Sequence, residues 1–204
     1  MSMDDTYNIL TAPSEGQYKE KGSKFIAWAI PVADEEEVKE NLVAIKKKYY
    51  DARHHCYAYV LGTDKQNFRS NDYGEPSGSA GKPILNQIYS ADITNVLVIV
   101  VRYFGGIKLG VSGLVNAYKT AAREAIQAAE KKTCTIDDTL DVYFTYPLMN
   151  DVMRVLKEEN LQPFATKFEI DCLLTLHCRK SQTNQVLEKL KNIYGVSIKT
   201  NGVT

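Results

Sequence analysis

The sequence predicts an α+β protein of two domains, and two patterns carry that prediction. Residues 96–101 are a continuous aliphatic run, typical of a strand buried on both faces, and a glycine-rich turn leads from it into an alanine-rich helix. After residue 134 the chain changes to shorter segments in the order strand, helix, strand, strand, helix, strand, which is the ferredoxin-like order. We therefore expect domains at 1–134 and 135–204.

The N-terminal domain is expected to alternate strands with amphipathic helices. Asp34 and Ser112 are the expected N-caps of two helices, because their side-chain oxygens can accept hydrogen bonds from first-turn N–H groups. Residues 14–23 and 65–80 are polar and are expected to be connections without regular structure. The expected strands are 7–12, 23–32, 54–61 and 95–101, and the expected helices are 34–50, 80–89 and 112–130.

In the C-terminal domain two segments have helical apolar spacing, 147–159 and 181–194. The segments between and around them favour strands. The expected strands are 139–145, 162–168, 170–178 and 196–200.

Composition bounds the function. The 204 residues carry no net charge, which excludes a strongly basic nucleic-acid binder but not a local basic face. The first twenty residues are polar, no apolar run reaches membrane-spanning length, and the four cysteines are widely spaced. We therefore expect a cytoplasmic protein with reduced thiols and no membrane association.

One charge pattern stands out around the buried strand. From Ile93 to Arg123 there is no acidic residue, so positive charge gathers where a glycine turn meets a helix start, an arrangement that can receive an anion. The alternative is that the glycines serve only tight turning and close packing. The candidate anion-binding or nucleic-acid-binding residues are Arg102, Lys108, Ser112, Lys119 and Arg123.

A second set of candidates surrounds the strand at 54–61. His54 and Cys56 share one face of that strand, and the loop at 72–82 follows it with acidic, hydroxyl and basic side chains. Neither a nucleophile elbow nor a metal-ligand spacing is present, so we predict no metal, no cofactor and no defined catalytic residue. The candidate cleft residues are His54, Cys56, Glu75, Ser77 and Lys82.

Three motifs together resemble the YigZ/IMPACT family. They are HHCYA at 54–58, GEPSGSAGKP at 74–83 and RYFGGIKLG at 102–110, and the resemblance covers roughly residues 15–130. Asp72-Tyr73 and Ser112-Gly113 depart from the family pattern, which usually has two acids and two glycines there.

The resemblance implies a fold and a role. The fold is an N-terminal domain like domain 2 of ribosomal proteins and elongation factors, with a left-handed βαβ crossover, followed by a ferredoxin-like domain. The implied role concerns RNA or the ribosome, and no catalytic residues come with the family. We therefore expect a non-enzymatic protein that binds RNA or the translation machinery, with translation regulation as its setting. The alternative is a small hydrolase or transferase whose site lies between His54–Cys56 and the loop from Asp72 to Lys82.

Overall fold

The computed structural model describes residues 5–169 and 171–201. These residues form two compact units, and the α+β, two-domain architecture expected from the sequence is confirmed. One unit spans Tyr7–Cys134. The other begins at Thr135 and also includes the described residues Asp5 and Thr6, so it differs from a simple division at residue 134.

The N-terminal unit is built on a five-stranded sheet in the order β2-β3-β6-β4-β5, and all neighbouring strands pair antiparallel. The aliphatic run lies in β6 at its centre, which explains why both of its faces are buried. The strands are β2 (Ser14–Glu20), β3 (Ser23–Pro31), β4 (His54–Leu61), β5 (Asn67–Asn71) and β6 (Val96–Tyr103).

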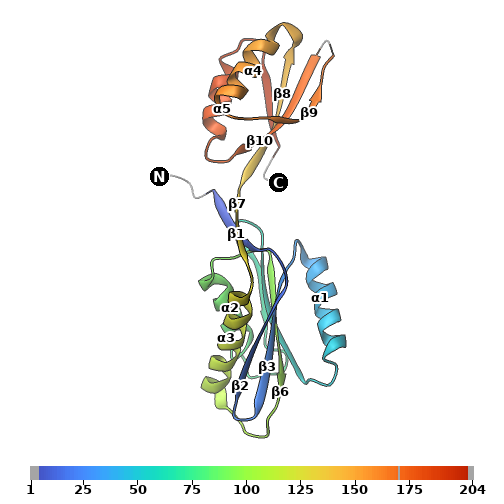
Figure 1. Cartoon of the computed structure of the whole chain (residues 1–204), viewed down its shortest axis with the longest axis vertical. Helices are drawn as coiled ribbons and strands as arrows, with labels where there is room; N and C mark the ends of the chain where they lie inside the picture. The colour runs from blue at the N-terminus through green and yellow to red at the C-terminus, as the bar shows by residue number, and fades with distance from the viewer. Residues whose placement is uncertain (1–4, 170, 202–204) are drawn as a thin grey trace. The chain divides into compact units, whose positions relative to one another are not determined.

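Helices cover both faces of this sheet (Figure 1). Helix α1 (Glu35–Lys48) packs Val38 and Ile45 on one face. Helices α2 (Gly81–Ser90) and α3 (Gly110–Ala128) cover the other face. Even-numbered residues of β4 and β6 point toward α2 and α3, so side chains at the ends of these strands meet the start of α3.

The alanine stripe of α3 packs closely against β2 and β3. A Cβ added to Gly16 in β2 would lie 2.2 Å from the backbone nitrogen of Ala125, so the helix backbone rests directly on that glycine. Small residues on both elements therefore fix the position of α3 on the sheet.

Several local predictions need correction. β2 and β5 occupy stretches expected to be irregular; both are edge strands with exposed polar side chains, so they lack an apolar run. Ser112 is not an N-cap, because α3 begins at Gly110 and Ser112 lies exposed within its first turn. Asp34 does cap α1, as expected.

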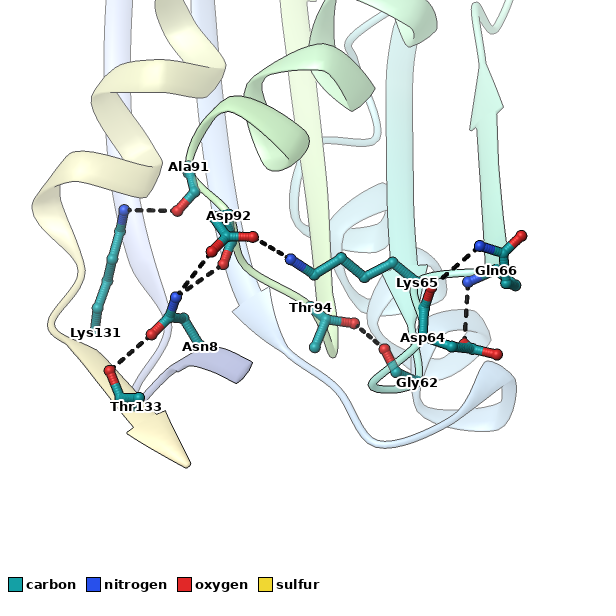
Figure 2. Close-up of polar contacts among 10 residues, drawn as sticks. All are labelled: Asn8, Gly62, Asp64, Lys65, Gln66, Ala91, Asp92, Thr94, Lys131 and Thr133. Atoms are coloured by element: carbon teal, nitrogen blue, oxygen red, sulfur yellow. Dashed lines mark hydrogen bonds and ion pairs between the residues drawn. The ribbon is translucent and has the colours of Figure 1, made fainter. Parts of the chain in front are cut away.

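The strand expected at 7–12 is β1 (Thr6–Leu10), and it pairs in a two-stranded ribbon with β7 (Lys131–Thr135), which was not predicted. Figure 2 shows how polar contacts tie it to the turn before β6. Asn8 Nδ2 donates to the carbonyl oxygen of Asp92 at 3.2 Å, and Thr133 Oγ1 donates to Asn8 Oδ1 at 2.7 Å. Lys65 forms an ion pair with Asp92 at the same point.

The C-terminal unit has the expected ferredoxin-like order, β11-β8-β10-β9, with antiparallel pairing throughout. Its two helices bury Val152 and Val186 with the apolar side chains of one sheet face. The predicted strand at 170–178 includes Ile170, which lies outside the described residues. The elements are β8 (Asp137–Thr145), a 3₁₀ turn (Tyr146–Leu148), α4 (Met149–Glu158), β9 (Pro163–Lys167), β10 (Asp171–Arg179), α5 (Thr183–Lys191) and β11 (Ser197–Asn201).

Candidate functional site

Three neighbouring strands place one row of side chains at the start of α3. Arg102 in β6 is directly opposite Phe25 in β3 on one side and His54 in β4 on the other. All three belong to the sheet face that α2 and α3 cover. The pairing register therefore puts a guanidinium between an aromatic ring and an imidazole.

Arg102 forms a buried ion pair. Its Nη1 donates to Glu75 Oε1 at 2.6 Å, and the two side chains are 7% and 4% exposed. The Tyr118 hydroxyl donates to the same carboxylate oxygen at 2.8 Å. Burial raises the pKa of Tyr118 far above its usual value, so this hydroxyl remains protonated and acts as a donor.

The ion pair leaves Arg102 with donor capacity. A guanidinium carries several N–H donors, and its Nε is buried without a hydrogen-bond partner among the described residues. The rings of Phe25 and Phe104 both lie 5.5 Å from Cζ, so aromatic faces hold the plane of the group.

A cavity of about 420 Å³ opens beside this arginine, and we call it the α3 pocket. Its floor contains Arg102 and Glu75, and its rim contains Lys108 and Phe104. Gly110 and Val111, the first residues of α3, form one wall. The remaining lining residues are Arg53, His54, Pro76, Leu109 and Leu114.

The wall at α3 is a helix N-terminus without a carboxylate. Within the described part of the chain, α3 has neither a side-chain cap nor an acidic residue in its first turn. The helix has 19 residues, so its first N–H groups and its dipole favour negative charge at this end. This arrangement can bind an anion.

Close backbone contact positions the turn that carries Lys108. A Cβ on Gly105 would lie 1.9 Å from the carbonyl carbon of Gly22, so only glycine fits. The Gly105 N–H also donates to Ser23 Oγ at 3.1 Å. The turn is therefore fastened to the β2–β3 hairpin before it reaches the pocket.

Asp72 orders the loop that supplies Glu75. Its carboxylate accepts N–H groups of Gly78, Ala80 and Gly81 at 2.8 to 3.0 Å. Burial opposes ionisation of Asp72, but these backbone donors outweigh it and lower the pKa of the carboxyl. Asp72 thus serves the N-terminus of α2 and fixes the loop.

Residues 21–126 match the family described as the Impact N-terminal domain, which covers more than half of the chain. The chain belongs to the IMPACT family. The expected resemblance is thereby confirmed, and the described site residues from His54 to Tyr118 all fall inside the matched range.

Relatives agree with this assignment. IMPACT family member YvyE of Bacillus subtilis is 41% identical over 51% of this chain, and the chain spans about half, 48%, of that relative's length. IMPACT family member YigZ of Escherichia coli is 36% identical over 67% of this chain and 69% of its own. A solved structure titled as that of a hypothetical protein is 27% identical, covers 99% of both chains and has a TM-score of 0.69.

The structure gathers four of the predicted site residues. Arg102 and Lys108 from the anion set meet His54 and Glu75 from the cleft set in the α3 pocket. The two sets, predicted separately, thus contribute to one cavity. His54 Nδ1 lies 3.1 Å from the carbonyl oxygen of Tyr73; because a carbonyl only accepts, Nδ1 carries the proton, which leaves Nε2 for a ligand.

The other predicted residues lie elsewhere. Lys119 and Arg123 are about 14 and 20 Å along α3 from Gly110, at ~1.5 Å per residue. Arg123 pairs with Glu124 there. Ser112, Ser77 and Lys82 are exposed and do not line the α3 pocket.

Cys56 is buried and does not line the α3 pocket. Its Sγ donates to the carbonyl oxygen of Asp72 at 2.9 Å. Burial raises the pKa of the Cys56 thiol to about 12, so it stays a thiol near neutral pH.

Sequence reasoning did not assign Tyr118, Phe104 or Arg53 to the site. Tyr118 gave one signal, a polar ring within the alanine stripe of α3, which requires a buried partner. That partner, Glu75, is 43 residues away and could not be found from local pattern.

Among the described residues, no group of three or more His, Cys, Asp or Glu side chains is placed to hold a metal ion. Nor does the described chain contain a helix long and apolar enough to cross a membrane.

Proposed function

We propose that this protein binds RNA without catalysing a reaction, and that an RNA phosphate occupies the α3 pocket. The observation that carries the proposal is the buried guanidinium of Arg102, which lines a cavity at a helix N-terminus that holds no carboxylate. These features supply donors and positive potential at one point.

The charge of the lining supports a phosphate. Arg53, Arg102 and Lys108 are cations and Glu75 is the one carboxylate among the lining residues, so the pocket has a net charge of +2. The Glu75 carboxylate is already engaged by Arg102 and Tyr118. Lys108 is exposed at the rim and can reach an incoming anion.

Apolar groups at the rim support a nucleic acid over a free anion. Phe104 and Val111 line the pocket and are 55% and 58% exposed. An exposed ring beside a basic pocket can stack a base, and such stacking contributes about 1–3 kcal/mol per base. Phosphate contact and base stacking together are typical of single-stranded RNA recognition.

The RNA is proposed to belong to the translation machinery, and the protein to act in the cytoplasm. Membership of the IMPACT family supports this setting, since the resemblance implies a role related to the ribosome. The structure offers less to the alternative of a hydrolase or transferase. The thiol of Cys56 is buried with a raised pKa, and Ser77 and Lys82 are exposed and do not line the pocket.

The test is RNA binding by the whole chain across a salt series. We expect affinity for single-stranded RNA to fall with salt, and Lys108→Ala to weaken it about tenfold while reducing the salt slope by about 1. Lys119→Ala is the matched control, because Lys119 is an exposed lysine on the same helix outside the pocket. Salt-independent binding, or equal losses in both variants, would contradict the proposal.

A further inference from the structure

The α3 pocket has more positive charge than one internal phosphodiester requires. Its lining carries a net charge of +2, and the N-terminus of α3 adds positive potential. A phosphodiester within an RNA strand carries a single negative charge. A terminal phosphomonoester carries about −1.5 to −2 near neutral pH and has an additional terminal oxygen. The charge of the pocket matches a terminal phosphomonoester better than an internal phosphodiester.

The hydrogen-bond donors of the pocket also favour a terminal phosphomonoester. The Arg102 guanidinium, the Lys108 ammonium and the first N–H groups of α3 all border one cavity. The ion pair with Glu75 uses Arg102 Nη1, so the guanidinium keeps further N–H donors. A terminal phosphate can accept hydrogen bonds from all these sides, whereas an ester oxygen on each side of a phosphodiester blocks some of them.

Buried side chains form the floor of the pocket. Arg102 and Glu75 lie there, with their ion pair fixed by Tyr118, and Leu114 is buried beside them. From a phosphate at this floor, an internal phosphodiester continues the strand in two directions, whereas a terminal phosphomonoester continues it in one.

An exit is present. A second cavity, of about 340 Å³, shares Arg53, His54, Arg102 and Phe104 with the α3 pocket and continues to Asp51 and Tyr103. The α3 pocket is of the size that holds a small ligand such as one nucleotide, about 300–1,000 Å³. The second cavity can take the nucleotide next to it, with Phe104 between the two.

We infer that the α3 pocket binds the end of an RNA strand, as a terminal phosphomonoester, with the chain leaving through the second cavity. This inference rests on the proposed RNA binding and names the part of the RNA that the pocket recognises.

The experiment compares one short single-stranded RNA sequence in four forms: 5′-phosphorylated, 3′-phosphorylated, hydroxyl at both ends, and circular. We expect one phosphorylated form to bind the whole chain at least about tenfold more tightly than the hydroxyl-ended and circular forms, as loss of one charged contact predicts. The phosphorylated form that binds more tightly identifies the strand end. Lys108→Ala should remove this preference, and Lys119→Ala should keep it.

The outcomes separate the two claims. Equal affinity for all four forms would overturn the inference and leave RNA binding in place. Binding of none would overturn both. Adenosine 5′-monophosphate is measured alone as a further probe; if it binds as tightly as the phosphorylated RNA, the pocket recognises a mononucleotide and the inference of a strand end fails.

Discussion

Helices α1 and α3 start on opposite faces of one sheet with opposite electrostatic surroundings. At α1, Asp34 Oδ1 accepts the N–H groups of Glu36 and Glu37, both at 2.9 Å, and three acidic residues occupy the first turn. At α3 the described chain offers no side-chain cap and no first-turn acid, and Lys108 precedes the helix. Side chains of the protein satisfy the N-terminal end of α1, whereas the N-terminal end of α3 remains able to receive an external anion.

Helix α2 is intermediate and clarifies the difference. Its N-terminal N–H groups are satisfied by Asp72, which lies several residues upstream in the loop. A carboxylate thus occupies the N-terminal end of α2 as well as that of α1. Absence of a local cap is therefore not sufficient for a site; α3 differs because a cavity and a buried arginine adjoin it.

Removing the carboxylate beneath α3 should have the largest effect. Glu75→Ala leaves the buried charge of Arg102 without its partner, and we expect the free energy of unfolding to fall by about 3–5 kcal/mol. Urea unfolding of the whole chain measures it. Glu124→Ala breaks the half-exposed pair with Arg123 further along α3 and should cost at most about 1 kcal/mol. Equal losses would show that the floor of the pocket is not specially dependent on its ion pair.

Removing the carboxylate at α2 should have the next largest effect. Asp72→Ala is expected to lower the free energy of unfolding by about 1.5–3 kcal/mol, since its backbone donors become unsatisfied. The pKa of Asp72 is lowered from 3.8 on folding, so the contribution is complete above that value and is lost as pH falls through the folded pKa. Unfolding measured against pH should show the wild-type advantage shrinking in acid; an advantage that grew in acid would contradict this sign.

Adding a carboxylate at α3 should make it resemble α1. Val111→Glu places an acid at an exposed first-turn position, where the helix dipole should stabilise the fold by about 0.3–1 kcal/mol. The same charge should weaken RNA binding about tenfold or more by repulsion. Val111→Gln is the neutral control and should lose much less affinity, because it removes only the apolar contact of Val111 and adds no charge. If Val111→Glu and Val111→Gln bind alike, phosphate does not occupy this end of the helix.

Removing the N-cap of α1 should have the smallest effect and should not create a second phosphate site. Asp34→Ala is expected to cost about 1 kcal/mol of stability, the usual loss for an N-cap. RNA affinity should stay constant, because three acidic residues remain in the first turn of α1 and the helix lies on the other sheet face. Thermal unfolding and the RNA titration together check this, and a gain or loss of affinity would contradict it.

Local patterns predicted the features that depend on neighbouring residues. The cap at Asp34, the strand from His54 to Leu61 and the ferredoxin-like order all follow from short-range rules. The acid-free stretch likewise located Arg102 and Lys108. Edge strands β2 and β5 did not follow, because half-exposed polar strands carry no apolar run.

The candidate site depended on contacts that sequence spacing cannot supply. Glu75 reaches Arg102 across 27 positions, so two separately predicted sets merged only in the fold. Lys119 and Arg123 show the opposite case: they are close to Lys108 in sequence, but helical geometry places them turns away along α3.

The most direct measurement is the change in backbone amide chemical shifts on titration with single-stranded RNA. One spectrum reports on both helices. The account predicts shifts at Gly110, Val111 and Ser112 in α3 that saturate with RNA, with no change at Glu36 and Glu37 in α1. RNA binding that leaves the first turn of α3 unchanged would contradict the central claim that this open N-terminus is the phosphate site.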